Sequence, residues 1–141
     1  DQNFEQALID FGYDDVIDDK LLTPNINSVD SLFLNGKSIS SLIGVEAFTA
    51  LTHLMCESNK LTNLDVSKNT ALTSLVCGNN QLTSLDVSKN TALTSLVCDN
   101  NQLTSLDVTQ NTALTELYCG ENQFDCSPQM DKINNLEEGG C

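Results

Sequence analysis

The chain has 141 residues, a length typical of one domain. Its 20 acidic and 6 basic residues, with no arginine among them, leave a formal net charge of -14. This charge excludes nucleic-acid binding, because neutralising phosphates requires a cationic surface. It also argues against docking on anionic lipid, which requires clustered Lys or Arg. No stretch has the roughly 18 consecutive apolar residues of a membrane span, and we expect none.

Residues 1–28 are predicted to form a helical N-terminal cap. Apolar residues recur at helical spacing, and a glycine follows as a stop signal: Phe4, Ala7, Leu8, Phe11 and Gly12. We expect the apolar face of this short helix to lie on the first coil of the repeat region that follows. An open end of such a region needs a cover because it exposes apolar side chains and unpaired strand edges.

Residues 29–124 are predicted to form a solenoid. Three nearly identical blocks of 21 residues begin at Thr49, Thr70 and Thr91, and a fourth begins at Thr112. Upstream, the segment that begins at Val29 fits the same pattern, 22 residues before the next copy. The pattern LxxLxCxxNxL with a period between 20 and 29 is the signature of leucine-rich repeats.

Each unit also contains its own half. The segment LTSLVCGNN, from Leu72, is followed after ten residues by LTSLDVSKN, from Leu82, on the same pattern. Both halves alternate inward and outward like a strand, and neither leaves room for a helix. We therefore predict a single, mainly β leucine-rich repeat domain of about five repeats. Its coil would be right-handed, with two parallel sheets on opposite walls and short α-helical caps at both ends.

Residues 125–141 are predicted to form the C-terminal cap. Ser127 and Pro128 are typical of the N-cap and first residue of a helix. An apolar face and a terminating glycine pair complete the expected helix: Met130, Ile133, Leu136, Gly139 and Gly140. This helix would close the last coil.

The six cysteines fall into two groups. Four take an inward position in successive repeats, where we expect a buried ladder of free thiols acting as small hydrophobes: Cys56, Cys77, Cys98 and Cys119. The alternatives are disulfides, for which the side chains would have to point toward each other, and zinc, for which collinear thiols give the wrong geometry. Cys126 and Cys141 bracket the terminal helix and, in a secreted chain, are predicted to form a disulfide. The alternative is a free Cys141.

Three segments resemble known families. ISSLIGVEAFTALTHL, at residues 39–54, resembles the leucine-rich repeats of internalins. The nested unit LTSLDVSKNTALTSLVC resembles the so-called IRREKO class of bacterial leucine-rich repeats, and DQNFEQALIDFGYDD is similar to N-terminal caps of such proteins in the Bacteroidetes. Together these resemblances extend to about Phe124. They imply a secreted or surface-attached bacterial protein whose first sheet recognises or adheres to a protein ligand, without enzymatic activity.

The predicted contact surface is the set of outward positions on the first strand, where the repeats differ most. Its members are Phe33, His53, Met55, Glu57, Val76, Val97, Asp99, Glu116 and Tyr118. A central apolar column with a polar rim is typical of a binding site, although β-propensity alone also favours such residues. The same column would permit a weak homodimer as well as a monomer. An alternative function is binding of glycan, ice or another repetitive ligand by the periodic Ser, Thr, Asn and Asp residues.

No catalytic or cofactor site is predicted. His53 faces outward, and no serine–histidine–acid arrangement is visible around it. Asp65, Asp86 and Asp107 would form an outward acidic column on the second sheet, relieved by neighbouring hydroxyls and lysines or by a cation. Calcium is considered there and in the acidic loop at residues 14–19, which lacks the spacing and glycine of an EF-hand. A solvated acidic loop is the alternative.

Overall fold

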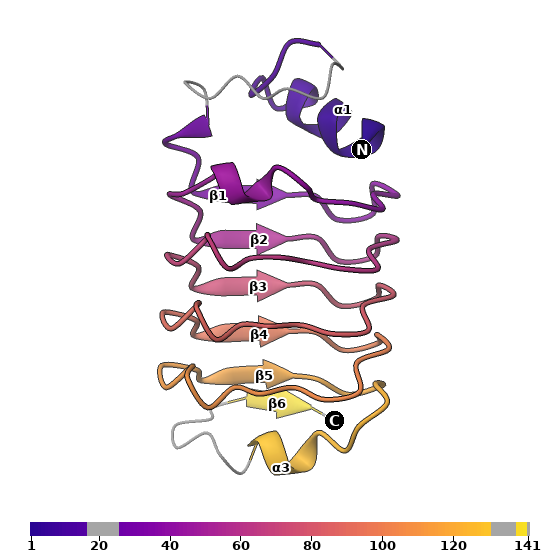
Figure 1. Cartoon of the computed structure of the whole chain (residues 1–141), viewed down its shortest axis with the longest axis vertical. Coiled ribbons are helices and arrows are strands. Elements are labelled where there is room, and N and C mark those ends of the chain that lie inside the picture. Colours follow the sequence, from indigo (N-terminus) through magenta and orange to yellow (C-terminus); the bar gives the residue numbers. More distant parts are fainter. Residues whose placement is uncertain (17–25, 131–137, 141) are drawn as a thin grey trace.

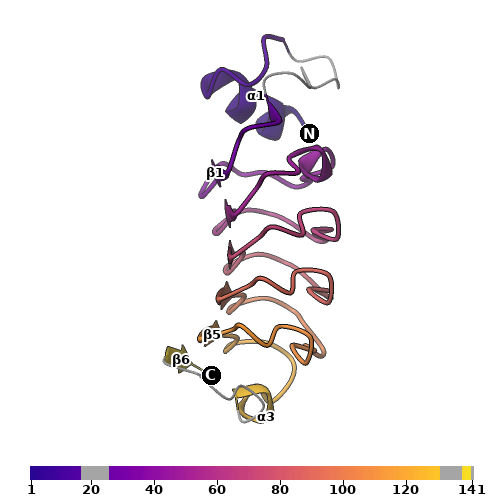
Figure 2. The same ribbon diagram turned by 90° about the vertical axis from the view of Figure 1, so that its left-hand side faces the viewer.

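The computed structural model describes residues 1–16, 26–130 and 138–140, which form an elongated stack of coils between two terminal caps (Figure 1). Its elements in chain order are α1 (Gln2–Asp10), β1 (Ser31–Phe33), the 3-10 helix η1 (Val45–Ala47), β2 (His53–Met55), β3 (Ser74–Val76), β4 (Ser95–Val97), β5 (Glu116–Tyr118), α3 (Ser127–Met130) and β6 (Glu138–Gly140). The rotated view shows the strands stacked along one wall of a narrow solenoid (Figure 2).

The strands of the described ranges form one parallel sheet in the order β1 to β6. Equivalent residues of successive repeats lie opposite each other: Leu32, Leu54, Leu75, Leu96 and Leu117. All five are buried, and with the other inward residues they form one continuous core. The solenoid predicted from the repeat is therefore confirmed.

The predicted second sheet is wrong. Within the described ranges, the wall opposite the strands runs as turns and irregular backbone, with the 3-10 helix η1 in the first coil. Asp65 Oδ1 accepts the Ser67 amide at 2.9 Å, and the Val66 carbonyl accepts the Asn69 amide at 3.0 Å. Because these bonds are local, the backbone turns before a ladder to the next coil can form.

Helix α1 covers the first coil as expected. Phe4, Ala7 and Leu8 are buried, whereas Phe11 lies at the edge of the helix with 37% of its surface exposed. The Asp1 carboxylate caps the helix through the amide of Phe4 and also accepts the Ser40 amide of the first coil at 3.0 Å. One side chain thus ends the helix and fixes it to the solenoid.

The C-terminal segment differs from its prediction. Helix α3 begins at Ser127, where Asp125 Oδ1 accepts the Ser127 amide at 3.0 Å. Ile133 and Leu136 lie outside the described residues. Gly139 and Gly140 were predicted to end the helix, and this is wrong because both belong to strand β6, which pairs with β5. The edge of β5 offers unpaired backbone groups, which a returning strand satisfies.

Candidate functional site

We call the outward side chains of β1 to β5 the strand face. In register they form a polar column, Ser31, His53, Ser74, Ser95 and Glu116, and an apolar column, Phe33, Met55, Val76, Val97 and Tyr118. Members of the apolar column are direct neighbours across strands, at a spacing of about 4.8 Å. Phe33 is 57% exposed, and the other four are partly exposed. The structure therefore brings the predicted apolar residues together as one stripe.

A third column borders the strand face where the strands end, and it contains Glu57, Gly78 and Asp99. Glu57 Oε1 accepts the Asn79 side-chain amide at 3.1 Å. A Cβ atom at Gly78 would lie 2.6 Å from Asp99 Oδ1, so the carboxylate occupies the space that a side chain at position 78 would need. Glycine at position 78 thus makes room for the aspartate at position 99 of the next repeat. Together, Glu57 and Asp99 make this edge of the strand face acidic.

His53 lies on β2 with its side chain exposed. Its Nδ1 is 2.8 Å from Thr52 Oγ1, which donates to the Asp30 carbonyl at 3.0 Å. Within the described ranges no carboxylate is hydrogen-bonded to the imidazole. The arrangement suits a surface contact residue.

The four cysteines that follow strands β2 to β5 are free and buried directly behind the strand face: Cys56, Cys77, Cys98 and Cys119. Burial raises the pKa of Cys56 to about 12 and that of Cys119 to about 11, and it also raises the pKa values of Cys77 and Cys98. At neutral pH these groups are thiols, not thiolates, and serve as core. Cys126 is also buried. Cys141 lies outside the described residues, and the Cys126–Cys141 disulfide stays a prediction.

The aspartate column lies on the opposite wall, where Asp65, Asp86 and Asp107 are exposed. Each carboxylate accepts the amide two residues later, at 2.9, 2.8 and 2.9 Å respectively. The Ser67 hydroxyl and amide lower the pKa of Asp65, and the Ser88 amide and hydroxyl lower the pKa of Asp86. The hydroxyls, which the sequence suggested, and the backbone amides, which it did not, thus both stabilise the charged carboxylates.

Metal ligation was considered for this column and for the acidic loop. Among the described residues, no group of three or more His, Cys, Asp or Glu side chains is suited to hold a metal ion. Within the loop, Asp14 is buried and its Oδ1 accepts the Asp15 amide at 2.9 Å. Residues 17–19, which carry Asp18 and Asp19, lie outside the described ranges. Calcium binding in the loop stays an untested expectation.

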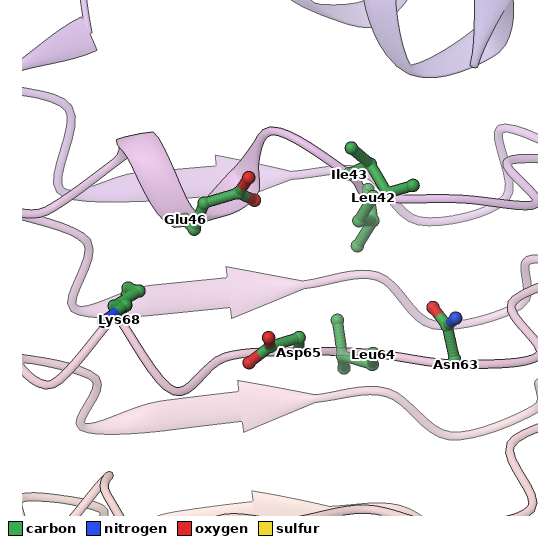
Figure 3. Close-up of a pocket in the computed structure, with 7 residues that line it drawn as sticks. All are labelled: Leu42, Ile43, Glu46, Asn63, Leu64, Asp65 and Lys68. Atoms are coloured by element: carbon green, nitrogen blue, oxygen red, sulfur yellow. The ribbon is translucent and has the colours of Figure 1, made fainter.

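A shallow hollow of about 220 Å³ opens on the wall opposite the strands, between the first two coils (Figure 3). Leu42, Ile43 and Glu46 line it from the first coil, and Asn63, Leu64, Asp65 and Lys68 line it from the second. Ile43 is 80% exposed. In the first coil it takes the position that Asp65 takes in the second. Sequence reasoning missed this hollow. The sequence does contain a sign of it, because ISSLIGVEAF in the first coil departs from the corresponding segment of the second coil, LTNLDVSKN.

A second hollow, of about 330 Å³, lies where the N-terminal cap meets the strand face. It is lined by Phe11, Tyr13, Asp30, Ser31 and Phe33. The rings of Phe11 and Tyr13 are 5.8 Å apart between centroids and inclined at 50°. Sequence reasoning assigned Phe11 to the helix and Phe33 to the apolar column. It missed the hollow because only the packing of the cap brings these two residues together.

Comparison with known proteins supports a leucine-rich repeat fold. A family model described as Leucine Rich repeats (2 copies) matches residues 70–111. The functional domain of InlJ from Listeria monocytogenes, which includes a cysteine ladder, is 33% identical, with a TM-score of 0.64 over 84% of this chain and 37% of that one. Internalin C2 from the same organism is 26% identical, with a TM-score of 0.76 over 82% of this chain and 53% of that one. No curated protein sequence matches significantly.

A leucine-rich repeat protein from Leptospira interrogans is 26% identical, with a TM-score of 0.72 over 82% of this chain and 32% of that one. The chain therefore spans about a third to a half of the length of these relatives. No helix in the described part of the chain is long and apolar enough to cross a membrane. The fold is a leucine-rich repeat solenoid, and it is similar to internalins.

Proposed function

We propose that this internalin-like leucine-rich repeat solenoid is a non-enzymatic recognition module that binds a protein partner through its strand face. The observation that carries the proposal is the apolar column, because a contiguous exposed apolar stripe with a polar rim is characteristic of a contact surface. Aromatic residues and Met, which occur in the column, are enriched at protein interfaces. The likeness to internalins and the leucine-rich repeats support the same class of function.

The strand face is also a rigid platform. Each strand pairs in parallel with its neighbours, and Asn80 ties the turn behind β3 to the preceding coil. A preformed surface loses little conformational entropy on binding, so more of its contact energy appears as affinity.

The proposal is tested with the double variant Met55→Asp with Tyr118→Asp. The immobilised intact domain is used to capture a partner, which is then purified and titrated against each variant. Two charges placed in the apolar column should weaken binding at least a hundredfold, because each would be buried against the partner without a counter-charge.

The matched control is Asn63→Asp with Ser84→Asp, which adds the same charge on exposed residues of the opposite wall. It should leave the affinity within about twofold, since distant surface substitutions have small effects. Full-strength binding by the strand-face variant would exclude the apolar column as the contact surface.

A second candidate is recognition of a glycan or another repetitive ligand by the wall opposite the strands. The supporting observation is that its polar residues are exposed in register with the repeat: Thr62, Thr83, Thr104, Asn63, Ser84 and Ser105. A glycan array probed with the intact domain tests it. In this experiment Asn63→Asp with Ser84→Asp is the test variant and should lose sugar binding. Met55→Asp with Tyr118→Asp is the control and should retain it. A sugar signal that survives the opposite-wall variant would rule this candidate out.

We further propose that the protein acts outside the cell or at its surface, as a monomer or weak dimer. The likeness to internalins supports this location, and a Cys126–Cys141 disulfide found in the native protein would add to that support. Intact-mass measurement of the native, non-reduced protein is the check. A disulfide makes the chain lighter by two hydrogen atoms than the form with six thiols.

A further inference from the structure

The hollow at the top of the strand face has the composition of a site for a cationic side chain. Three aromatic rings, those of Phe11, Tyr13 and Phe33, contribute to its lining. Phe33 is 57% exposed and Phe11 is 37% exposed, so their surfaces are accessible to a partner. The faces of aromatic rings attract cations through their quadrupole, and Arg or Lys is the usual protein partner. The volume of about 330 Å³ is at the lower end of small-ligand pockets and suits a single long side chain.

The ring of Phe11 already contacts a cation from this chain. Lys37 Nζ lies 5.5 Å from the centroid of the Phe11 ring. Lys37 does not line the aromatic hollow itself. This contact shows that the ring is placed where an ammonium group can approach it.

Asp30 supplies a carboxylate to the same hollow. Its Oδ1 accepts the Ser31 hydroxyl at 2.9 Å, and its carbonyl accepts the amides of Thr52 and His53 at 2.8 and 3.0 Å. The residue is thereby held in place by the first two coils. Its Oδ2 accepts no hydrogen bond from the described residues, which leaves it available to a donor from outside. A carboxylate beside aromatic rings provides the two interactions that a guanidinium group makes best.

The charge around the strand face favours the same occupant. Asp30, Glu57, Asp99 and Glu116 lie on or beside the face, and no lysine belongs to its columns. A surface with this sign of charge attracts basic partners and repels acidic ones.

We propose that the hollow formed by Phe11, Tyr13, Asp30, Ser31 and Phe33 receives an arginine or lysine side chain of the protein partner whose apolar residues lie along the column. This inference rests on the proposed function, because the hollow is continuous with the strand face through Phe33. It adds the chemistry of the partner: a basic anchor at one end followed by apolar residues.

The test is a displayed random-peptide library selected on the intact chain. Selected peptides should carry an enriched Arg or Lys beside apolar positions. One such peptide is then synthesised with arginine and with citrulline, its neutral isostere. Both forms are titrated against the wild type and against Asp30→Asn, which keeps the size of the side chain and an acceptor for Ser31.

The exchange of arginine for citrulline should weaken binding to the wild type about tenfold. Against Asp30→Asn the same exchange should weaken binding less than about threefold, because this variant already lacks the carboxylate that pairs with the guanidinium group. Phe33→Leu should also lower the affinity of the arginine peptide, while Asp86→Asn, an equal change of charge on the opposite wall, should leave it unchanged.

The remaining outcomes separate this inference from the proposed function. One outcome is that the selected peptides carry no basic residue and do not bind the variant Met55→Asp with Tyr118→Asp. This would overturn the proposed basic anchor but support the strand face as the binding surface. An effect of citrulline that is equal in wild type and Asp30→Asn would also overturn the anchor, since the cation would then be bound elsewhere. Peptides insensitive to every strand-face variant would overturn both proposals.

Discussion

The two walls of the solenoid come from the same ten-residue pattern and yet differ in structure. On the strand wall, the outward residue between Leu75 and Cys77 is Val76, and the Cys77 amide donates to the next coil at 2.8 Å. On the opposite wall, the equivalent position is Asp86, whose carboxylate accepts the Ser88 amide of its own coil. An apolar β-branched residue has no group to compete for the backbone, whereas aspartate does. From the second coil to the fourth, this outward aspartate therefore favours turns over a second sheet.

The asparagines of the two walls differ in the same way. Asn80 Nδ2 donates to the carbonyls of Cys56 and Cys77 at 3.0 and 3.1 Å, while its Oδ1 accepts the Leu61 amide at 3.0 Å. Asn90 Nδ2 donates to two carbonyls at 2.9 Å, but its buried Oδ1 has no partner among the described residues. The strand wall therefore satisfies its buried polar groups more completely, and it should respond more strongly to perturbation.

The largest expected difference between the walls is instability in alkali, which arises from the strand wall. Burial raises the pKa of Cys56 from 9.0 to about 12, and the other three thiols of the ladder shift in the same direction. Above pH 9 the unfolded chain releases thiol protons that the folded chain retains, so stability is full below pH 9 and falls as pH rises toward 12. Each thiol contributes about 1.4 kcal/mol per pH unit. Thermal denaturation between pH 8 and pH 11 measures this loss.

The matched control replaces Cys77 with valine, the buried residue that the opposite wall has at the equivalent position, Val87. The alkaline fall in stability should become shallower by about 1.4 kcal/mol per pH unit, because one proton no longer contributes. An unchanged slope in Cys77→Val would attribute the alkaline transition to other groups.

The next effect in size is the loss of an asparagine from each wall. Asn80→Ala leaves the buried Leu61 amide without a partner and removes one of the two side-chain donors from each of the Cys56 and Cys77 carbonyls, which keep Asn59 and Asn101. This should cost about 3 kcal/mol of unfolding free energy. Asn90→Ala removes two hydrogen bonds but also removes the unpartnered Oδ1, and about 1 kcal/mol is expected. Urea denaturation of the two variants compares the walls directly. Equal costs would mean that the unpartnered Oδ1 carries no penalty.

The repeat predicted the solenoid, its core and the columns of the strand face, because spacing alone fixes which residues meet in successive coils. The predicted second sheet was wrong because side chains there compete with the neighbouring coil for backbone hydrogen bonds, as Asp65 does for the Ser67 amide. Hydrophobic alternation does not reveal which acceptor an amide will bind. It also failed at Gly139, where the choice between helix end and strand depends on the open edge of β5. The aromatic hollow was missed because Tyr13 and Phe33 meet only through the packing of the cap, which no local pattern encodes.

The smallest expected effect belongs to the exposed acids of the opposite wall and has the opposite dependence on pH. Hydrogen bonds from Ser67 and Ser88 lower the pKa values of Asp65 and Asp86 below their ordinary value of 3.8. Their contribution is therefore complete above about pH 4 and is lost as pH falls further. Because both carboxylates are exposed, solvent screening keeps this loss small. Denaturation of Asp86→Asn and wild type at pH 7 and pH 3 should show the variant slightly less stable at pH 7 and the gap closing at pH 3. A gap that widened in acid would contradict the hydrogen-bonded aspartate as the stabilising group, and with it the account of why this wall turns.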